Sequence, residues 1–181
     1  NVDDSKLAQQ VLLSGQINDL QGRLNVTNLL QGEQLDAANV IAFQRLFDAL
    51  ALPPAQLSAL TQGLLAAQRK ADGAPLMPQR LSQLTWLGLT PQTLQILSPH
   101  ITLLPTRTPI NVNTASIPVL YASVPGLDLA QAQRLVRARA NQPWSNLEEV
   151  RQTLGTQSGS LQDDRHSVAS RFFEITGQIR L

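Results

Sequence analysis

The chain opens with two short stretches in which apolar and polar positions alternate. The first is the segment 11–20, whose one side collects Leu13, Gly15, Ile17 and Asp19. The second is the segment 23–27, which follows the turn-forming pair Gln21-Gly22. A period of two is typical of a half-buried strand, so this region predicts two short strands joined by a tight connection.

The end of the chain alternates in the same way. Between positions 172 and 181, one side collects Phe173, Ile175, Gly177, Ile179 and Leu181. This pattern predicts a final strand. We therefore expect strands at both ends of the chain, lying in one sheet.

Between these ends the apolar positions follow the period of a helix. A first helix is predicted from Asp36, which is placed to cap it, with the apolar positions Val40, Phe43, Leu46, Phe47 and Leu50. Pro53-Pro54 ends this helix, and Pro54 suits the first turn of a second one. The second helix turns Leu57, Leu60, Leu64 and Leu65 inward.

Two further helices and an extended segment follow. A third helix carries Leu81, Leu84 and Leu87 and ends at Gly88. Thr90 is placed to cap a fourth helix that begins at Pro91. The segment 103–109 contains two prolines, which favour an extended backbone.

A second helical group is predicted from Thr114 to Leu154. Asn113 or Thr114 caps its first helix, and Pro125-Gly126 turns the chain into a second helix. The apolar positions that pack the second and third helices on the first are Leu129, Ala132, Leu135, Val136, Trp144 and Leu147. Small residues at 155–160 predict a flexible connection to the final strands.

The order of strand, helices and strand predicts an α+β protein in which a helical module is inserted into a sheet. The expected sheet domain is discontinuous and spans 1–33 and 155–181. The inserted module divides into a first helical subdomain at 34–109 and a second at 110–154. The bulk of the chain then protrudes from a small antiparallel sheet made by its two ends.

Composition and charge exclude several classes of function. The 181 residues include 14 basic and 13 acidic side chains, a net charge of +1 that is too small for a general polyanion binder. The absence of cysteine excludes disulfides, thiolate zinc sites and a thiol nucleophile. No apolar run reaches the roughly 18 residues that span a bilayer. The chain starts at Asn1 and not at Met, which suggests a trimmed or processed piece and is compatible with the removal of either an anchor or a signal segment.

No catalytic constellation stands out. The two histidines, His100 and His166, lie outside any metal-ligand spacing, and the chain lacks phosphate-binding and nucleophile-elbow motifs. Glu148 and Glu149 lie beside Arg151 at a predicted helix start, where acidic side chains stabilise the helix dipole. The sequence therefore predicts a protein that is not an enzyme.

One acidic pair is a candidate metal site. Asp163 and Asp164 lie in a polar stretch, and Asp3-Asp4 lies at the N-terminus. Calcium prefers several oxygen ligands, which carboxylates and backbone carbonyls of polar loops supply. No EF-hand spacing is present, so Asp163 and Asp164 are either a calcium site or part of a solvated loop.

The segment 110–150 is similar to helix-hairpin-helix modules of DNA-uptake and repair proteins. The similarity rests on Ile110-Asn111-Val112-Asn113-Thr114-Ala115, Val124-Pro125-Gly126-Leu127, Pro143-Trp144 and Leu147-Glu148-Glu149-Val150. Such hairpins hold phosphate through backbone N–H groups at a Gly-x-Gly turn. Here Asp128 occupies the second glycine position, and Arg139 lies round the helix from Arg137. We therefore expect a structural hairpin, with DNA binding as the alternative function.

Taken together, the motifs resemble those of the K-type minor pseudopilins of type II secretion systems (general secretion pathway protein K). The first is the segment 17–29, similar to the family pattern D-x-x-G-R-x-N-x-N-x-L, and the second is Leu104-Pro105 leading into 110–115. The third is the segment 167–173, similar to the S-x-x-F that precedes the last strands of the family. The resemblance covers nearly the whole chain, although the cysteine pair that is frequent in the family is absent.

The resemblance implies a fold and a place in the cell. It implies a pilin-like sheet domain with a large inserted helical domain of SAM-like or helix-hairpin-helix-like type. It also implies a periplasmic position at the bacterial inner membrane, with an N-terminal membrane helix that precedes Asn1. Some family members bind calcium in the pilin-like part, where Asp163 and Asp164 are the nearby acidic pair.

The resemblance also implies a non-enzymatic role in protein export. Members of the family join the I-type and J-type minor pseudopilins in a complex at the tip of the pseudopilus. The bulky helical insert leaves no room for another subunit above, so the protein caps the fibre. Secreted substrates are a further expected partner, and nucleic acid is not.

Overall fold

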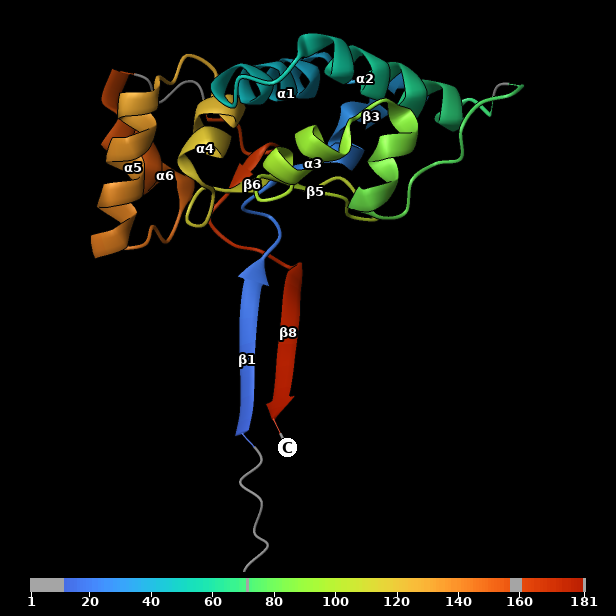
Figure 1. Cartoon of the computed structure of the whole chain (residues 1–181). Coiled ribbons are helices and arrows are strands. Elements are labelled where there is room, and N and C mark those ends of the chain that lie inside the picture. Colours follow the sequence, from blue (N-terminus) through green and yellow to red (C-terminus); the bar gives the residue numbers. More distant parts are fainter. Residues whose placement is uncertain (1–11, 71, 157–160, 181) are drawn as a thin grey trace, which may run out of the picture.

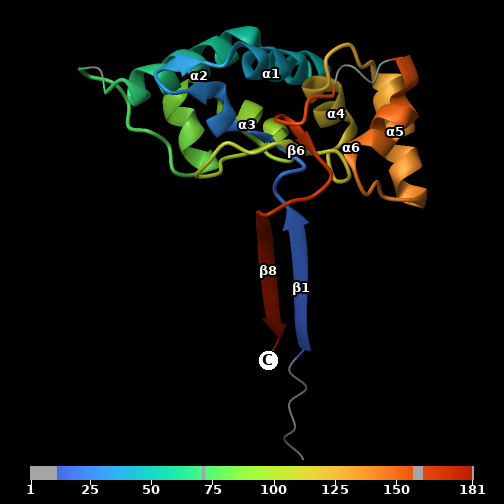
Figure 2. The same cartoon turned by 180° about the vertical axis from the view of Figure 1, so that it is seen from behind.

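The two ends of the chain pair with each other to form a ribbon that projects from a helical body. The computed structural model describes residues 12–70, 72–156 and 161–180. Strand β1 (Leu12–Asp19) and strand β8 (Phe173–Arg180) run antiparallel along their whole lengths. The body lies across one end of this ribbon, and both views show the ribbon standing away from it (Figure 1, Figure 2). The expected α+β class and the sheet shared by the chain ends are therefore confirmed.

The expected hairpin between the first two alternating stretches is wrong. Strand β2 (Leu24–Asn25) does not pair with β1 but runs parallel to β5 (Ile101–Thr102) inside the body. Between the strands, Gln21-Gly22 leads the chain from the ribbon into the body, where Leu24 is buried. The alternation at 23–27 reflects this burial and the 3-10 turn η1 (Val26–Leu29) that follows.

The first helical group follows the sequence expectation closely. Its elements are the short hairpin β3 (Leu30–Gln31) and β4 (Gln34–Leu35), helices α1 (Ala37–Ala49) and α2 (Pro54–Gln68), the 3-10 helix η2 (Leu81–Leu87) and helix α3 (Pro91–Leu97). Thr90 caps α3 by accepting the N–H of Thr93, and Pro54 occupies the first turn of α2, as expected. The third helix is 3-10 and not α. It ends at Gly88, whose φ of 98° and close approach to Ala59 both require glycine.

Asp36 caps α1 and also anchors the extended segment 103–109. Its side chain accepts the backbone N–H of Asn39 at 3.0 Å and a hydrogen bond from Arg107 at 2.6 Å. Arg107 also donates to the Leu30 carbonyl. Burial raises the pKa of Asp36, but the hydrogen bonds from Asn39 and Arg107 outweigh it and leave this pKa below its usual value.

The second helical group differs from expectation at its caps. It consists of β6 (Ile110–Asn111), α4 (Ile117–Ser123), α5 (Leu129–Asn141), α6 (Leu147–Leu154) and β7 (His166–Ser167), which runs parallel to β6. Ser116, and not Asn113 or Thr114, precedes α4. Leu129 is exposed at the start of α5 and does not pack inward, because Asp128 forms the cap one residue before it. Of the predicted connection 155–160, residues 157–160 lie outside the described residues.

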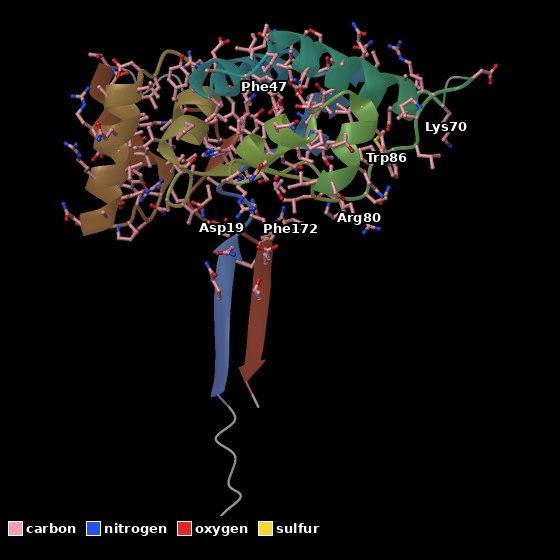
Figure 3. The ribbon with its side chains drawn as sticks, viewed as in Figure 1. Asp19, Phe47, Lys70, Arg80, Trp86 and Phe172 are labelled. Carbon is pink, nitrogen blue, oxygen red and sulfur yellow. The ribbon has the colours of Figure 1, made fainter. Side chains whose placement is uncertain are left out.

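One hydrophobic core runs through both helical groups. It joins Phe43, Leu46 and Phe47 of α1 to buried side chains of α2 and α4, and Figure 3 marks Phe47 in the upper part of the body, away from the ribbon. Arg45 reinforces this contact. Its guanidinium donates to the carbonyl of Tyr121 in α4 and to that of Leu127 in the turn after α4, and it lies 4.2 Å from the centre of the Tyr121 ring.

We predict that Arg45→Met destabilises the body by about 1–3 kcal/mol, because the carbonyls of Tyr121 and Leu127 lose their charged donor. Urea unfolding followed by circular dichroism measures the change. Gln44→Met is the matched control, since Gln44 is the exposed neighbour on α1. Equal stability of the two variants would contradict a role of Arg45 in joining α1 to α4.

Candidate functional site

The ribbon carries apolar side chains on one face and polar side chains on the other. Ile17 pairs with Ile175 and Asp19 with Phe173 on one face. On the other face Gln16 pairs with Thr176, and Asn18 donates a hydrogen bond to Glu174 at 3.2 Å. The alternation predicted at both chain ends is thus confirmed as two faces of one ribbon.

The apolar face is exposed and not half-buried as expected. The exposed fractions are 68% for Ile17, 75% for Ile175 and 51% for Phe173. Among residues 12–70, 72–156 and 161–180, no third strand or helix lies on this face. Two-stranded ribbons are marginally stable in water, and a contiguous apolar face marks an interaction surface. We call Ile17, Phe173 and Ile175 the ribbon face.

Near its middle, the apolar side of the ribbon carries no side chains, because two glycines lie opposite each other there. Gly15 pairs with Gly177 directly beside the Ile17–Ile175 pair. A Cβ atom added at Gly177 would meet nothing within 4 Å. Glycines in a strand allow another molecule to approach the backbone closely. The ribbon face therefore lies beside a glycine pair at which the backbone is accessible.

At the root of the ribbon, the carboxylate of Asp19 accepts four hydrogen bonds. Oδ1 accepts from the backbone N–H of Gln21 at 2.8 Å. Oδ2 accepts from Asn111 Nδ2 at 3.0 Å, Thr114 Oγ1 at 2.5 Å and Ser170 Oγ at 2.7 Å. Figure 3 shows Asp19 and Phe172 where the strands meet the body. Asp19 thus joins β1 to the start of the second helical group and to the segment before β8.

Buried Gln21 continues this junction into the body. Its amide donates to the Pro109 carbonyl at 3.3 Å and accepts the N–H of Arg171 at 2.6 Å. Gly22 is required beside it, because a Cβ atom there would lie 2.7 Å from the Thr114 hydroxyl oxygen. The pair Gln21-Gly22 therefore provides close packing between segments and not a hairpin turn.

The polar side chains of the segment 110–115 are engaged inside the protein. Asn111 is buried and bonds Asp19 and Ser170. Asn113 exchanges two hydrogen bonds with the backbone of Trp144 and donates to the Val168 carbonyl. This motif holds the second helical group to the C-terminal segment, and neither asparagine is left to contact a ligand.

In the hairpin between α4 and α5, residues of the chain itself cap the N-terminus of α5. Gly126 has a φ of 76°, as its turn requires. Asp128 accepts the N–H of Gln131, whose side chain bonds the backbone N–H of Asp128 in return. A carboxylate therefore occupies the helix N-terminus where a phosphate would bind. Arg139 donates to the Val112 carbonyl at 2.6 Å, which directs one of the arginines of this helix inward.

The candidate calcium residues lie apart from the ribbon face and its junction. Asp163 forms an ion pair with Arg151, and Asp164 lies 4.0 Å from Arg165. Both carboxylates are largely exposed. Within the described parts of the chain, no three acidic, histidine or cysteine side chains group together as metal ligands. Asp3-Asp4 lies outside the described residues, and calcium at Asp163 and Asp164 stays a prediction.

If calcium binds Asp163 and Asp164, millimolar calcium should raise the melting temperature and a chelator should lower it again. Saturation at 100 times Kd corresponds to about 2.7 kcal/mol of stabilisation. Asp163→Asn combined with Asp164→Asn should abolish the shift, because the oxygen ligands lose their charge. A melting temperature that ignores both calcium and chelator would refute the site.

Both histidines bond groups within the protein, and neither belongs to a cluster of metal ligands among the described residues. His166 is 1% exposed, and its ring meets the Ser123 carbonyl through Nε2 at 3.1 Å and the Gln162 N–H through Nδ1 at 3.1 Å. A neutral ring with its proton on Nε2 satisfies both partners. His100 Nδ1 lies 3.0 Å from the Ser116 hydroxyl.

A hollow of the body beside the segment 103–107 offers no catalytic group. It encloses about 490 Å³ and is lined mainly by Leu30, Leu64, Met77, Leu103 and Leu104. The charged side chain at its rim is Arg107, which Asp36 already engages. The hollow therefore lacks the convergent titratable side chains of an active site.

The sequence reasoning missed the role of Asp19 and Gln21. The alternating pattern puts Asp19 on the apolar side of β1 without indicating a further role. The signal that could have identified it is a charged residue at the end of that apolar side, directly before a Gln-Gly pair. Its partners Asn111, Thr114 and Ser170 come from distant segments, so spacing did not predict them.

We predict that the free energy of unfolding decreases as the pH falls below about 6.5. Burial lowers the pKa of both His100 and His166, and Arg23 lowers that of His100 further. As the pH falls, the histidines of the unfolded chain therefore bind protons before those of the folded chain do. The histidine contribution is therefore complete above the unfolded pKa and is lost on acidification, with a slope of at most about 1.4 kcal/mol per pH unit for each histidine.

Denaturant unfolding between pH 7.5 and 5 measures this slope. His166→Gln removes one titrating group and should flatten the curve, because glutamine carries no proton at any of these pH values. His100→Gln tests the second histidine separately. A slope that is the same in wild type and in both variants would contradict the prediction.

The comparisons with known proteins agree with this geometry. Two family models, both described as type II secretion system protein K, match residues 22–106 and 110–169. Type II secretion system protein K of Pseudomonas aeruginosa is 27% identical over 193 residues, which cover 91% of this chain and 56% of that protein. The chain thus spans little more than half the length of this relative.

A solved structure has the same fold. It is a chain in the crystal structure of the GspK-GspI-GspJ complex from the type 2 secretion system of enterotoxigenic Escherichia coli. The TM-score is 0.64 at 18% sequence identity, and the match covers 94% of this chain and 70% of that one. No helix of the residues described is long and apolar enough to cross a bilayer. Since the two family models together match most of the chain, it belongs to the type II secretion system protein K family.

Proposed function

We propose that this chain is the globular part of a minor pseudopilin that caps the tip of the type II secretion pseudopilus. It acts without catalysis, on the periplasmic face of the inner membrane, and assembles with the I-type and J-type minor pseudopilins to support protein export. The related protein K of Escherichia coli was crystallised with GspI and GspJ. The observation that carries the proposal is the ribbon face, an apolar surface on a projecting element.

The shape of the molecule supports the capping role. The body is much wider than the ribbon and lies across its end (Figure 1, Figure 2). If the ribbon packs along the fibre, the body covers the position of the next subunit. The body would then meet whatever lies beyond the tip, and secreted substrates are candidates for that contact.

A division of the chain into domains is part of the same proposal. We propose a discontinuous pilin-like domain at 1–33 and 155–181, a first helical subdomain at 34–109 and a helix-hairpin-helix-like subdomain at 110–154. The support is the gap between the matches of the two family models, which falls between residues 106 and 110. Buried side chains of both helical subdomains belong to one hydrophobic core, which supports their packing as one body.

The polar residues of the α4–α5 hairpin form hydrogen bonds within the protein, which supports a structural role over the DNA-binding alternative. Asp128 and Gln131 satisfy the start of α5, and Arg139 is directed to a backbone carbonyl. With a net charge of +1, little counterion release is left to drive binding. A salt-dependent gel shift with duplex DNA at low micromolar protein would favour the alternative.

We predict that Ile175→Asp weakens assembly with soluble I-type and J-type minor pseudopilins at least about tenfold, because complex formation would bury an unpaired charge. Stability should change by no more than about 0.5 kcal/mol, since Ile175 is exposed. Native mass spectrometry of the mixed proteins measures the complex, and wild type should give one copy of each subunit.

The matched control is Thr176→Asp, which places the same charge on the polar face of the ribbon. It should leave the complex intact. Equal loss in both variants would indicate a general charge effect and not a specific role of the ribbon face. A wild-type mixture that shows only free subunits would overturn the proposed assembly.

A further inference from the structure

We infer that Asp19 is a positioning residue that fixes the angle between the ribbon and the helical body. The ribbon leaves the body through two peptide connections, at residues 20–23 and 168–172. Two single connections by themselves leave the direction of a projecting ribbon open, because loop backbones rotate easily. Additional contacts at the root must therefore hold the ribbon in one direction.

Asp19 bonds every segment that meets at this root. Through Gln21 it holds the chain that enters the body, and through Ser170 it holds the chain that returns to β8. Through Asn111 and Thr114 it holds the start of the second helical group. One carboxylate thus ties both connections to the body.

The chemistry of the junction favours a fixed angle. Three donors converge on the single oxygen Oδ2, which a carboxylate accommodates because its charge strengthens each hydrogen bond. Asn111 and Ser170 also bond each other, at 2.9 Å, so the donors are held in place. Because Asp19 is half-buried, water competes only in part for these positions.

The opposite face of the ribbon at the same level makes no such contact. Asn18 bonds Gln16 and Glu174, which both belong to the ribbon. Neighbouring positions of one strand therefore differ in role. Asn18 joins strand to strand, and Asp19 joins the ribbon to the body, which makes Asn18→Ala a matched control for Asp19→Ala.

The functional meaning of a fixed angle rests on the proposed function. A cap must hold its body across the fibre end, so the direction of the ribbon relative to the body decides whether the next position is covered. A variant that loses the angle keeps both the ribbon face and the body. It would lose only their relative orientation.

Distances between spin labels test the junction directly in the isolated chain. The chain has no cysteine, so Thr176→Cys on the ribbon and Gln62→Cys on α2 give two unique exposed labelling sites. Pulsed electron spin resonance should show one narrow distance distribution. Asp19→Ala should broaden it at least about twofold, and Asn18→Ala should leave it unchanged.

A second label pair separates orientation from folding. Labels at Gln62→Cys and Gln133→Cys both lie on the body and should give the same distribution with and without Asp19. If Asp19→Ala also broadens the distribution of this pair, the variant has lost its fold and a second variant is used. Thr114→Val combined with Ser170→Ala keeps Asp19 and removes two of its hydrogen-bond donors. Broadening confined to the ribbon–body pair supports the inference. An unchanged ribbon–body distribution in a folded variant overturns it.

The failure of the inference is distinguishable from the failure of the proposed function. The label distances need no partner subunit, whereas assembly with the I-type and J-type proteins is measured separately. Broadened distances together with lost assembly support the functional meaning of the angle. If the distances broaden while assembly and secretion stay unchanged, the role of Asp19 in the junction is confirmed. The claim that a fixed angle is needed for function is then overturned.

Discussion

The structure depends on the antiparallel pairing of the two ends of the chain. Strands β1 and β8 enclose the whole helical body between them. Closing so long a loop costs entropy that grows only slowly with its length, so the pairing is compatible with a large insert. The pairing also sends both connections into the body at one place, which is why the polar junction at Asp19 can hold them together.

Inside the body, short parallel bridges replace a sheet. Strands β2 and β5, and likewise β6 and β7, pair over two residues each and tie segments that are far apart in the sequence. The hydrophobic core also holds these segments together, since α1 packs against both α2 and α4. This arrangement explains how a chain without disulfides keeps two helical groups in one orientation.

Polar residues that resemble a binding motif serve structure here. Asn111 and Asn113 of the segment 110–115 bond the ribbon root, Trp144 and the C-terminal segment. Asp128 satisfies the start of α5, where related hairpins hold phosphate. An exposed apolar pair, Ile17 and Ile175, lies instead on the projecting ribbon. These polar side chains are hydrogen-bonded within the protein, whereas apolar side chains of the ribbon are exposed. This contrast favours a protein that binds other proteins.

The sequence by itself determined the main helices, the strands at both chain ends and the family. Helix periodicity and the caps Asp36 and Thr90 predicted α1 and α3, because these signals act within a few residues. Alternation predicted the strands at both ends, and the motifs predicted the resemblance. Only the tertiary structure decided that β1 pairs with β8 and not with its neighbour, that the ribbon face is exposed, and that Asp19 meets Asn111, Thr114 and Ser170. These contacts join residues more than 90 positions apart. Local patterns do not encode such contacts, because the packing of the whole chain selects among many possible partners.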